Sequence, residues 1–182
     1  MLTHDQRKWL LQLARDAVAA AVNGQTPAKV TCSQAALNEK CGAFVTLKTH
    51  GQLRGCIGQF EADTPLWQTV QRMAVAAAVE DPRFYDHRLR PEDLAALKID
   101  ISVLSPLQRT DDPLSLELGR HGIYLRRGSR SGCFLPQVAT ETGWSKEEFL
   151  SHCAAGKAGL EPDAWRDPRT EVYLFTAEVI EE

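Results

Sequence analysis

Two pairs of β-like runs, each joined by a short turn that contains glycine, restrict the fold of this sequence more than any other feature. In residues 42–60 (GAFVTLKTHGQLRGCIGQF) the runs flank a His50-Gly51 turn, and in residues 123–135 (IYLRRGSRSGCFL) they flank RGSRSG. Alternation of apolar and polar residues is typical of strands, whose successive side chains point to opposite faces. Because tight turns join antiparallel strands, the pattern predicts two β-hairpins.

Capping and periodicity patterns predict helices around these hairpins. Thr3 and Gln6 form a capping-box pattern at the start of a helix that ends at Gly24, and Ser145 begins another with the sequence SKEE. The other expected elements are a helix capped at Thr64 that ends before Pro82, a short helix at 90–98, a polar linker at 108–122, and strands at 99–107 and 170–182.

Strand and helix patterns do not alternate along the chain as they would in βαβ units. The sequence therefore predicts an α+β fold, in which a mainly antiparallel sheet is flanked by helices. Residues 1–182 are expected to form a single domain, with a smaller lobe or subdomain around residues 119–159.

The net charge and the cysteine pattern limit the classes of partner and the cellular compartment that we expect for this protein. The net charge of −3 gives no general attraction to phosphate backbones, so a nucleic-acid partner is disfavoured. We find no signal-peptide pattern and no apolar run of membrane-spanning length, and therefore expect no membrane association. The five cysteines lack C-x-x-C and zinc-site spacing, which predicts free thiols, no metal and a cytoplasmic location.

Cys56, inside LRGCIG (residues 53–58), is the candidate nucleophile. Arg54, two residues away in the same strand, is expected on the same face, where its cation would favour the reactive thiolate. Gly55 and Gly58 would let a ligand approach the backbone. In the alternative interpretation Cys56 is a small buried apolar residue and the glycines shape a bulge. A catalytic role also needs a base, and the histidines considered for it are His50, His87 and His121.

Two arginine-containing segments are candidate anion sites. In DPRFYDHRLRPED (residues 81–93), Arg83 could bind a carboxylate or phosphate in bidentate fashion. Alternatively, Asp81 and Pro82 end a helix while Arg83 makes structural ion pairs and Phe84 joins the core. The second segment would form an exposed basic stripe from Arg120, Arg126, Arg127 and Arg130.

Four segments in this order, LRGCIGQF, DPRF, IDISVLSPL and FLPQVATETGWSKEEFLSHCAAGKAGL, make the chain resemble the AMME-syndrome candidate-region domain family. This family is called protein A of the AmmeMemoRadiSam system in prokaryotes. The resemblance implies an α+β fold with a smaller subdomain, and genes located beside those of a Memo-like protein and a radical-SAM enzyme. It provides no catalytic assignment to transfer, and we expect no cofactor. The matching positions are Leu53, Arg54, Gly55, Cys56, Ile57 and Gly58; Asp81, Pro82, Arg83 and Phe84; and Leu135, Pro136, Gln137, Val138 and Trp144.

After DPRF, relatives commonly carry a proline-containing segment, whereas this chain has YDHR at residues 85–88. Three functions are compatible with these patterns. The favoured one is a partner or substrate-presenting subunit that acts with the Memo-like and radical-SAM proteins. The first alternative is a small enzyme with Cys56 as nucleophile and Arg54 or Arg83 holding an anionic substrate. The second, disfavoured alternative is a nucleic-acid-binding module.

Overall fold

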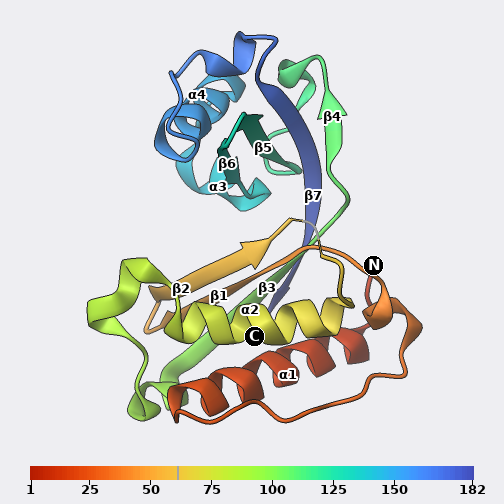
Figure 1. Ribbon diagram of the computed structural model, residues 1–182, viewed down its shortest axis with the longest axis vertical. Helices are drawn as coiled ribbons and strands as arrows, with labels where there is room; N and C mark the ends of the chain where they lie inside the picture. Colours follow the sequence, from red (N-terminus) through yellow and green to blue (C-terminus); the bar gives the residue numbers. More distant parts are fainter. Residues whose placement is uncertain (61) are drawn as a thin grey trace. The chain divides into compact units, whose positions relative to one another are not determined.

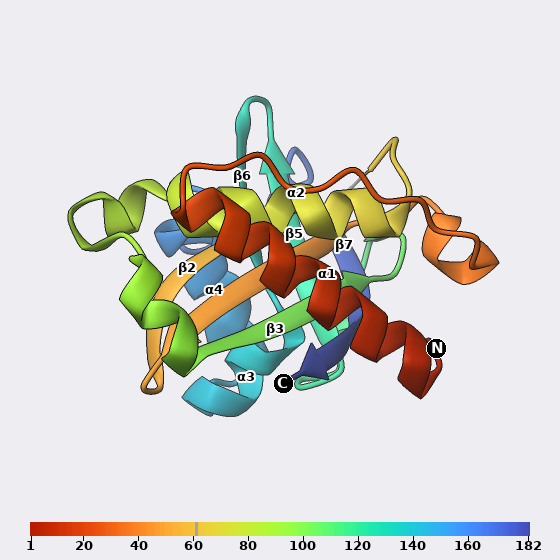
Figure 2. The same cartoon turned by 90° about the horizontal axis from the view of Figure 1, so that it is seen from below.

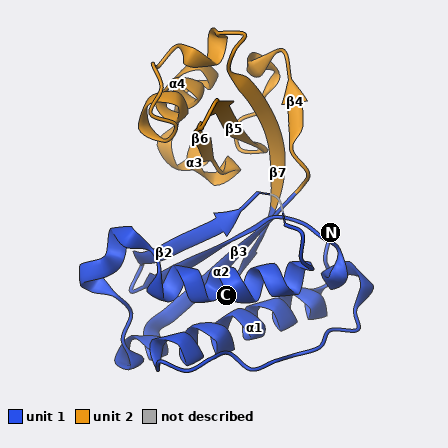
Figure 3. Cartoon of the chain, viewed as in Figure 1, with its two compact units in different colours: residues 1–104, 178–182 blue, residues 105–177 orange. Residues whose placement is uncertain are grey.

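A computed structural model describes residues 1–60 and 62–182, and the chain divides into two compact units (Figure 3). Unit 1 comprises Met1–Leu104 and Glu178–Glu182, and unit 2 comprises Ser105–Ala177. Unit 2 is thus inserted between the last two strands that unit 1 uses. It contains residues 119–159 and extends beyond this segment at both ends.

Unit 1 is an antiparallel sheet with two long helices on one face. Strand β2 (Gln52–Gln59) forms the edge, followed by β1 (Ala43–Thr49), β3 (Leu97–Leu104) and then β7 (Glu171–Glu181), whose end lies in this unit. Figures 1 and 2 show that α1 (His4–Val22) and α2 (Leu66–Val79) cover the same face of these strands. The core lies between the helices and the buried, alternating side chains of β1 and β3.

Local sequence accounts for the two helices. The capping box of Thr3 and Gln6 is present as predicted and satisfies N–H groups at the start of α1. The cap predicted at Thr64 was wrong: Pro65 is the N-cap of α2, and the Thr64 hydroxyl instead shares a 3.1 Å hydrogen bond with Thr69. Small buried alanines let α2 approach the sheet closely, and these are Ala74, Ala76, Ala77 and Ala78.

Unit 2 is built around the second predicted hairpin. Strands β5 (His121–Arg127) and β6 (Arg130–Phe134) pair antiparallel across Gly128 and Ser129, and β7 and the short β4 (Gln108–Thr110) continue the sheet. Helices α3 (Pro136–Thr142) and α4 (Lys146–Gly156) complete the unit. The capping box predicted at Ser145 is present at the start of α4. A separate core of this unit includes Ile123, Leu125, Phe149, Leu150 and Trp165.

The α+β fold with an antiparallel sheet is confirmed, with some local differences from the expectation. Residues 108–110 form β4 rather than part of a polar linker, and residues 136–142 form an α-helix that the sequence did not indicate. The segments Pro82–His87 and Pro91–Ala96 are 3-10 helices. The remaining short 3-10 turns are Ala35–Asn38, Pro113–Ser115 and Ala164–Arg166. None of the helices in residues 1–60 and 62–182 has the length and apolar character required to cross a membrane.

Candidate functional site

A β-bulge lies in the middle of LRGCIG. Leu47 of β1 pairs with Gly55, but the next residue, Lys48, pairs with Leu53, so Arg54 is the extra residue on β2. A bulge of this kind places two successive residues of one strand opposite a single residue of its partner. The side-chain alternation of β2 is therefore interrupted at Arg54.

The bulge separates Arg54 from Cys56. The Thr46 hydroxyl lies 3.3 Å from the Cys56 Sγ, whereas the Arg54 guanidinium donates a 3.0 Å hydrogen bond to the Thr49 hydroxyl. Thr46 and Thr49 are three residues apart on β1 and so face opposite sides of the sheet. The expectation that Arg54 and Cys56 share a face was wrong, because it assumed an unbroken two-residue period.

The two glycines of the motif admit close neighbours. A Cβ at Gly55 would lie 2.0 Å from the carbonyl oxygen of Ala77 in α2, and a Cβ at Gly58 would lie 2.2 Å from the Phe44 ring. The space beside each glycine is therefore filled by the fold itself. Gly55 in particular allows a helix backbone to pack directly on a strand backbone.

Asp81 and Arg83 hold the backbone of Cys56 at the sheet edge. The Cys56 N–H donates to Asp81 Oδ2 (2.9 Å), and the Arg83 guanidinium donates to the Cys56 carbonyl (2.9 Å). The guanidinium also forms two bonds with the Asp81 carboxylate, at 3.0 and 2.7 Å. Edge strands expose unpaired backbone groups, and here two side chains satisfy them. Arg83 thus makes the structural ion pair of the alternative interpretation.

The Asp81 carboxylate is ionised despite its burial. Its side chain is 1% exposed, and burial by itself would raise its pKa. The hydrogen bonds from the Arg83 guanidinium and from the Cys56 and Arg83 N–H groups outweigh burial and hold the pKa of Asp81 below its ordinary value. The hydrogen bond to Asp81 in turn raises the pKa of Arg83.

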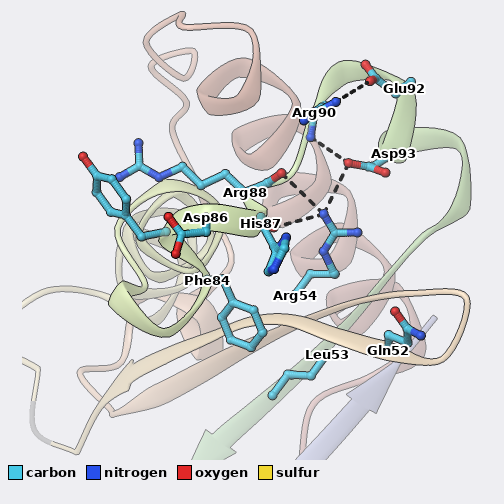
Figure 4. A pocket seen from close by; sticks show the side chains of 11 residues that line it. Gln52, Leu53, Arg54, Phe84, Asp86, His87, Arg88, Arg90, Glu92 and Asp93 are labelled. Carbon is cyan, nitrogen blue, oxygen red and sulfur yellow. Dashed lines mark hydrogen bonds and ion pairs between the residues drawn. The ribbon is translucent and has the colours of Figure 1, made fainter.

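Arg54 fixes the loop that follows α2, residues 81–93, to strand β2. Its guanidinium donates to the carbonyl oxygens of His87 (3.1 Å) and Arg88 (3.4 Å) and lies 3.5 Å from Asp93 Oδ2 (Figure 4). Asp93 Oδ2 also accepts a 2.8 Å bond from the Arg90 N–H. Together with the contacts of Asp81 and Arg83, these bonds join LRGCIG and residues 81–93 into one structural unit.

A pocket of about 650 Å³ lies between β2 and this loop (Figure 4). It combines charged side chains with two of the most exposed large apolar residues in the described chain, Tyr85 (67% exposed) and Leu53 (40%). The Arg88 guanidinium stacks on the Tyr85 ring at 4.2 Å from its centroid. The lining residues are Gln52, Leu53, Arg54, Phe84, Tyr85, Asp86, His87, Arg88, Arg90, Glu92 and Asp93. Such a mixture can bind a polar ligand that also carries an apolar group.

The residues singled out in the sequence separate into two sets. Arg54 lines the pocket together with His87, whereas Cys56 and Arg83 do not. Within residues 1–60 and 62–182, no hydrogen bond joins Cys56 to a histidine. The sequence singled out the segment DPRFYDHRLRPED through Arg83, but it did not indicate Tyr85, although the crowding of charges around two aromatics was a usable signal.

The arginines expected to form a basic stripe in unit 2 are largely neutralised. Arg120 pairs with Glu117, Arg126 with Glu171 and Arg127 with Asp167, while Arg130 donates to the carbonyl of Gly159. These pairs reduce the attraction that a nucleic-acid backbone would experience. Over the part of the chain that the structure describes, no group of three or more His, Cys, Asp or Glu side chains is arranged to hold a metal ion.

The role of Arg54 in holding residues 84–93 can be tested with Arg54→Met, which approximately keeps the length of the side chain and removes its hydrogen-bond donors. We expect amide hydrogen exchange in residues 84–93 to accelerate by about tenfold or more, because hydrogen bonds to a charged group contribute about 1.5–3 kcal/mol. Lys48→Met, which removes a surface ion pair to Asp100, is the matched control. Unchanged amide exchange in Arg54→Met would show that Arg54 does not hold this loop.

The fold and the site define a class: an α+β protein with an inserted second unit and a polar pocket held against the edge strand of its first sheet. The sequence model of the AMMECR1 family matches residues 11–180, and the chain belongs to this family. This confirms the resemblance to the AMME-syndrome candidate-region domain family.

Relatives cover nearly the full chain. "Protein MK0488" of Methanopyrus kandleri is 43% identical over 100% of this chain and 90% of its own length. "Protein NEQ441" of Nanoarchaeum equitans is 42% identical over 95% of this chain and 98% of its own. The crystal structure of uncharacterized protein PH0010 from Pyrococcus horikoshii matches with a TM-score of 0.91 at 37% identity, covering 100% of this chain and 93% of that one.

Proposed function

We propose that this protein is a cytoplasmic binding subunit that engages a Memo-like protein or a radical-SAM enzyme through the pocket beside LRGCIG. The observation that supports this most is the exposure of Tyr85 and Leu53 at one pocket, on a loop fixed by Arg54. Large exposed apolar side chains among arginines are typical of protein interfaces, and tyrosine and arginine are enriched in binding hot spots.

The surroundings of Cys56 favour binding over nucleophilic catalysis at this residue. Its Sγ contacts the Thr46 hydroxyl, and its N–H and carbonyl are occupied by Asp81 and Arg83. A nucleophilic thiol requires a base or a cation directed at its sulfur. Arg54, the cation proposed for this role, contacts Thr49 on the opposite face of the sheet. LRGCIG is thus better suited to shape the pocket than to react.

The test is complex formation with purified Memo-like protein and purified radical-SAM enzyme from the same organism, measured by biolayer interferometry. We expect Tyr85→Ala and Leu53→Ser each to weaken the complex by about tenfold or more, as hot-spot truncations do. Leu118→Ser is the matched control, because Leu118 is 39% exposed in unit 2 while Leu53 is 40% exposed.

Cys56→Ser distinguishes the two functions. If the protein is a binding subunit, this variant keeps its affinity for the partner within about twofold, since the backbone contacts of residue 56 remain. The proposal would be contradicted if Tyr85→Ala and Leu53→Ser left the affinity of the complex unchanged, or if no complex formed with either protein. Alkylation of Cys56 that blocks an enzymatic turnover would favour the cysteine-dependent enzyme.

A further inference from the structure

Arg88 differs from the other arginines that line the pocket. Arg54 lies against Asp93, and Arg90 pairs with Glu92 at 3.8 Å. For the Arg88 guanidinium, the described residues 1–60 and 62–182 provide the Tyr85 ring but no hydrogen bond and no ion pair. Its donors are therefore available to a ligand, while stacking restricts the plane of the group.

The backbone below Arg88 is fixed before any ligand arrives. Arg54 binds the carbonyl oxygens of His87 and Arg88, and Asp81 accepts from the Arg83 N–H at 3.2 Å, close to the start of the same 3-10 helix. A group that is already ordered loses little conformational entropy on binding. In Figure 4 the Arg88 side chain extends away from Arg54.

The remaining lining of the pocket includes apolar side chains and three carboxylates. Leu53, Phe84 and the exposed face of Tyr85 offer contact to an apolar side chain. Of the lining carboxylates, Glu92 and Asp93 have arginine partners, and Asp86 has none in the described part of the chain. Asp86 should therefore reduce the affinity of the pocket for anions without abolishing it.

We propose that the pocket binds an acidic polypeptide segment, with a carboxylate held by Arg88 and an adjoining apolar side chain against Leu53 and Phe84. Arginine presents a planar fork that matches a carboxylate in bidentate fashion. This inference rests on the proposed function and specifies the chemistry that the partner must offer. Charge complementarity to an unpaired arginine favours an acidic segment over a neutral or basic one.

The experiment uses fluorescence anisotropy with three labelled peptides that share one leucine. The first is rich in Glu and amidated at its C-terminus, the second is neutral with a free terminal carboxylate, and the third is neutral and amidated. We expect the first or the second to bind, and which of them binds tells a side-chain carboxylate from a chain terminus. Arg88→Gln should weaken this binding by about tenfold or more, as expected for a lost charge-assisted pair.

Two variants serve as matched comparisons. Arg166→Gln is the control, since Arg166 also stacks on an aromatic ring, that of Trp165 at 4.4 Å, but already pairs with Glu147 in unit 2. It should leave peptide binding unchanged. Asp86→Asn should tighten binding severalfold, because it removes the unpaired lining carboxylate. The histidine ring signals in an NMR titration provide a local readout, with His87 assigned through His87→Gln.

The inference is overturned if the neutral amidated peptide binds as well as the others, or if Arg88→Gln has no effect. It is also overturned if a polyuridylate oligonucleotide binds through Arg88 while the peptides do not. If a protein complex forms and depends on Leu53 and Tyr85, but no peptide binds, this inference is wrong and the proposed function is retained. If a peptide binds through Arg88, but no complex forms with the Memo-like protein or the radical-SAM enzyme, the peptide site is retained and the proposed function is wrong.

Discussion

Gly55→Ala is expected to lower the free energy of unfolding by about 3 kcal/mol or more, because the added methyl group has no space. The added Cβ would lie 2.0 Å from the Ala77 carbonyl oxygen and 2.9 Å from its carbonyl carbon. Both are backbone atoms of α2, so relief requires the helix or the strand to move. Chemical denaturation followed by circular dichroism measures the loss.

Gly156→Ala is the matched control for this substitution. Gly156 ends α4, nothing lies within 4 Å of its ideal Cβ, and its φ is not positive. Alanine is the better helix former, so this variant should be neutral or more stable by up to about 1 kcal/mol. If Gly55→Ala is as stable as Gly156→Ala, the close contact between β2 and α2 is not a feature of the folded protein.

Asp81→Asn is expected to cost about 2 kcal/mol of stability at neutral pH. The buried carboxylate accepts hydrogen bonds from the Cys56 N–H, the Arg83 N–H and the Arg83 guanidinium, and the amide retains only one acceptor oxygen. Partial exposure of Arg83 limits the cost, since water can solvate its released guanidinium. Asp100→Asn, which removes a surface pair with Lys48, should change stability by less than about 1 kcal/mol.

The pH dependence gives this prediction a second readout. The pKa of Asp81 is lower in the folded protein than in the unfolded chain, where it is about 3.9. Its contribution to stability is therefore complete above that value and is lost as the pH falls through the folded pKa. The stability difference between wild type and Asp81→Asn should shrink below about pH 4. A difference that stays constant through this range would show that the charge of Asp81 is not involved.

Much of the fold could be predicted because its signals are local. The caps at Thr3 and Ser145, the turn at His50-Gly51 and the alternation along both hairpins each depend on residues a few positions apart. From these, an antiparallel α+β arrangement follows without knowledge of distant contacts. The short strand β4 escaped prediction because three polar residues carry no alternation, and its pairing with β7 spans more than sixty positions.

The site could be predicted only in part. The motif LRGCIG and the segment DPRF were both identified, but the relation between them depends on one inserted residue in the strand register. Alternation cannot reveal a bulge, so Arg54 was assigned to the wrong face. Likewise, sequence could not show that Arg83 binds the backbone of Cys56, because that contact joins residues 27 positions apart.

The course of strand β7 imposes an order on folding during synthesis. Every residue of unit 2, Ser105–Ala177, is added to the growing chain before Glu178–Glu182, which complete the sheet of unit 1. Glu178 pairs with Arg7 and Glu182 with Arg15, so α1 also gains its final partners late. Until then β3 lacks its β7 neighbour and presents an open sheet edge on the ribosome. Unit 1, whose synthesis begins first, can therefore be the last of the two units to complete its folding.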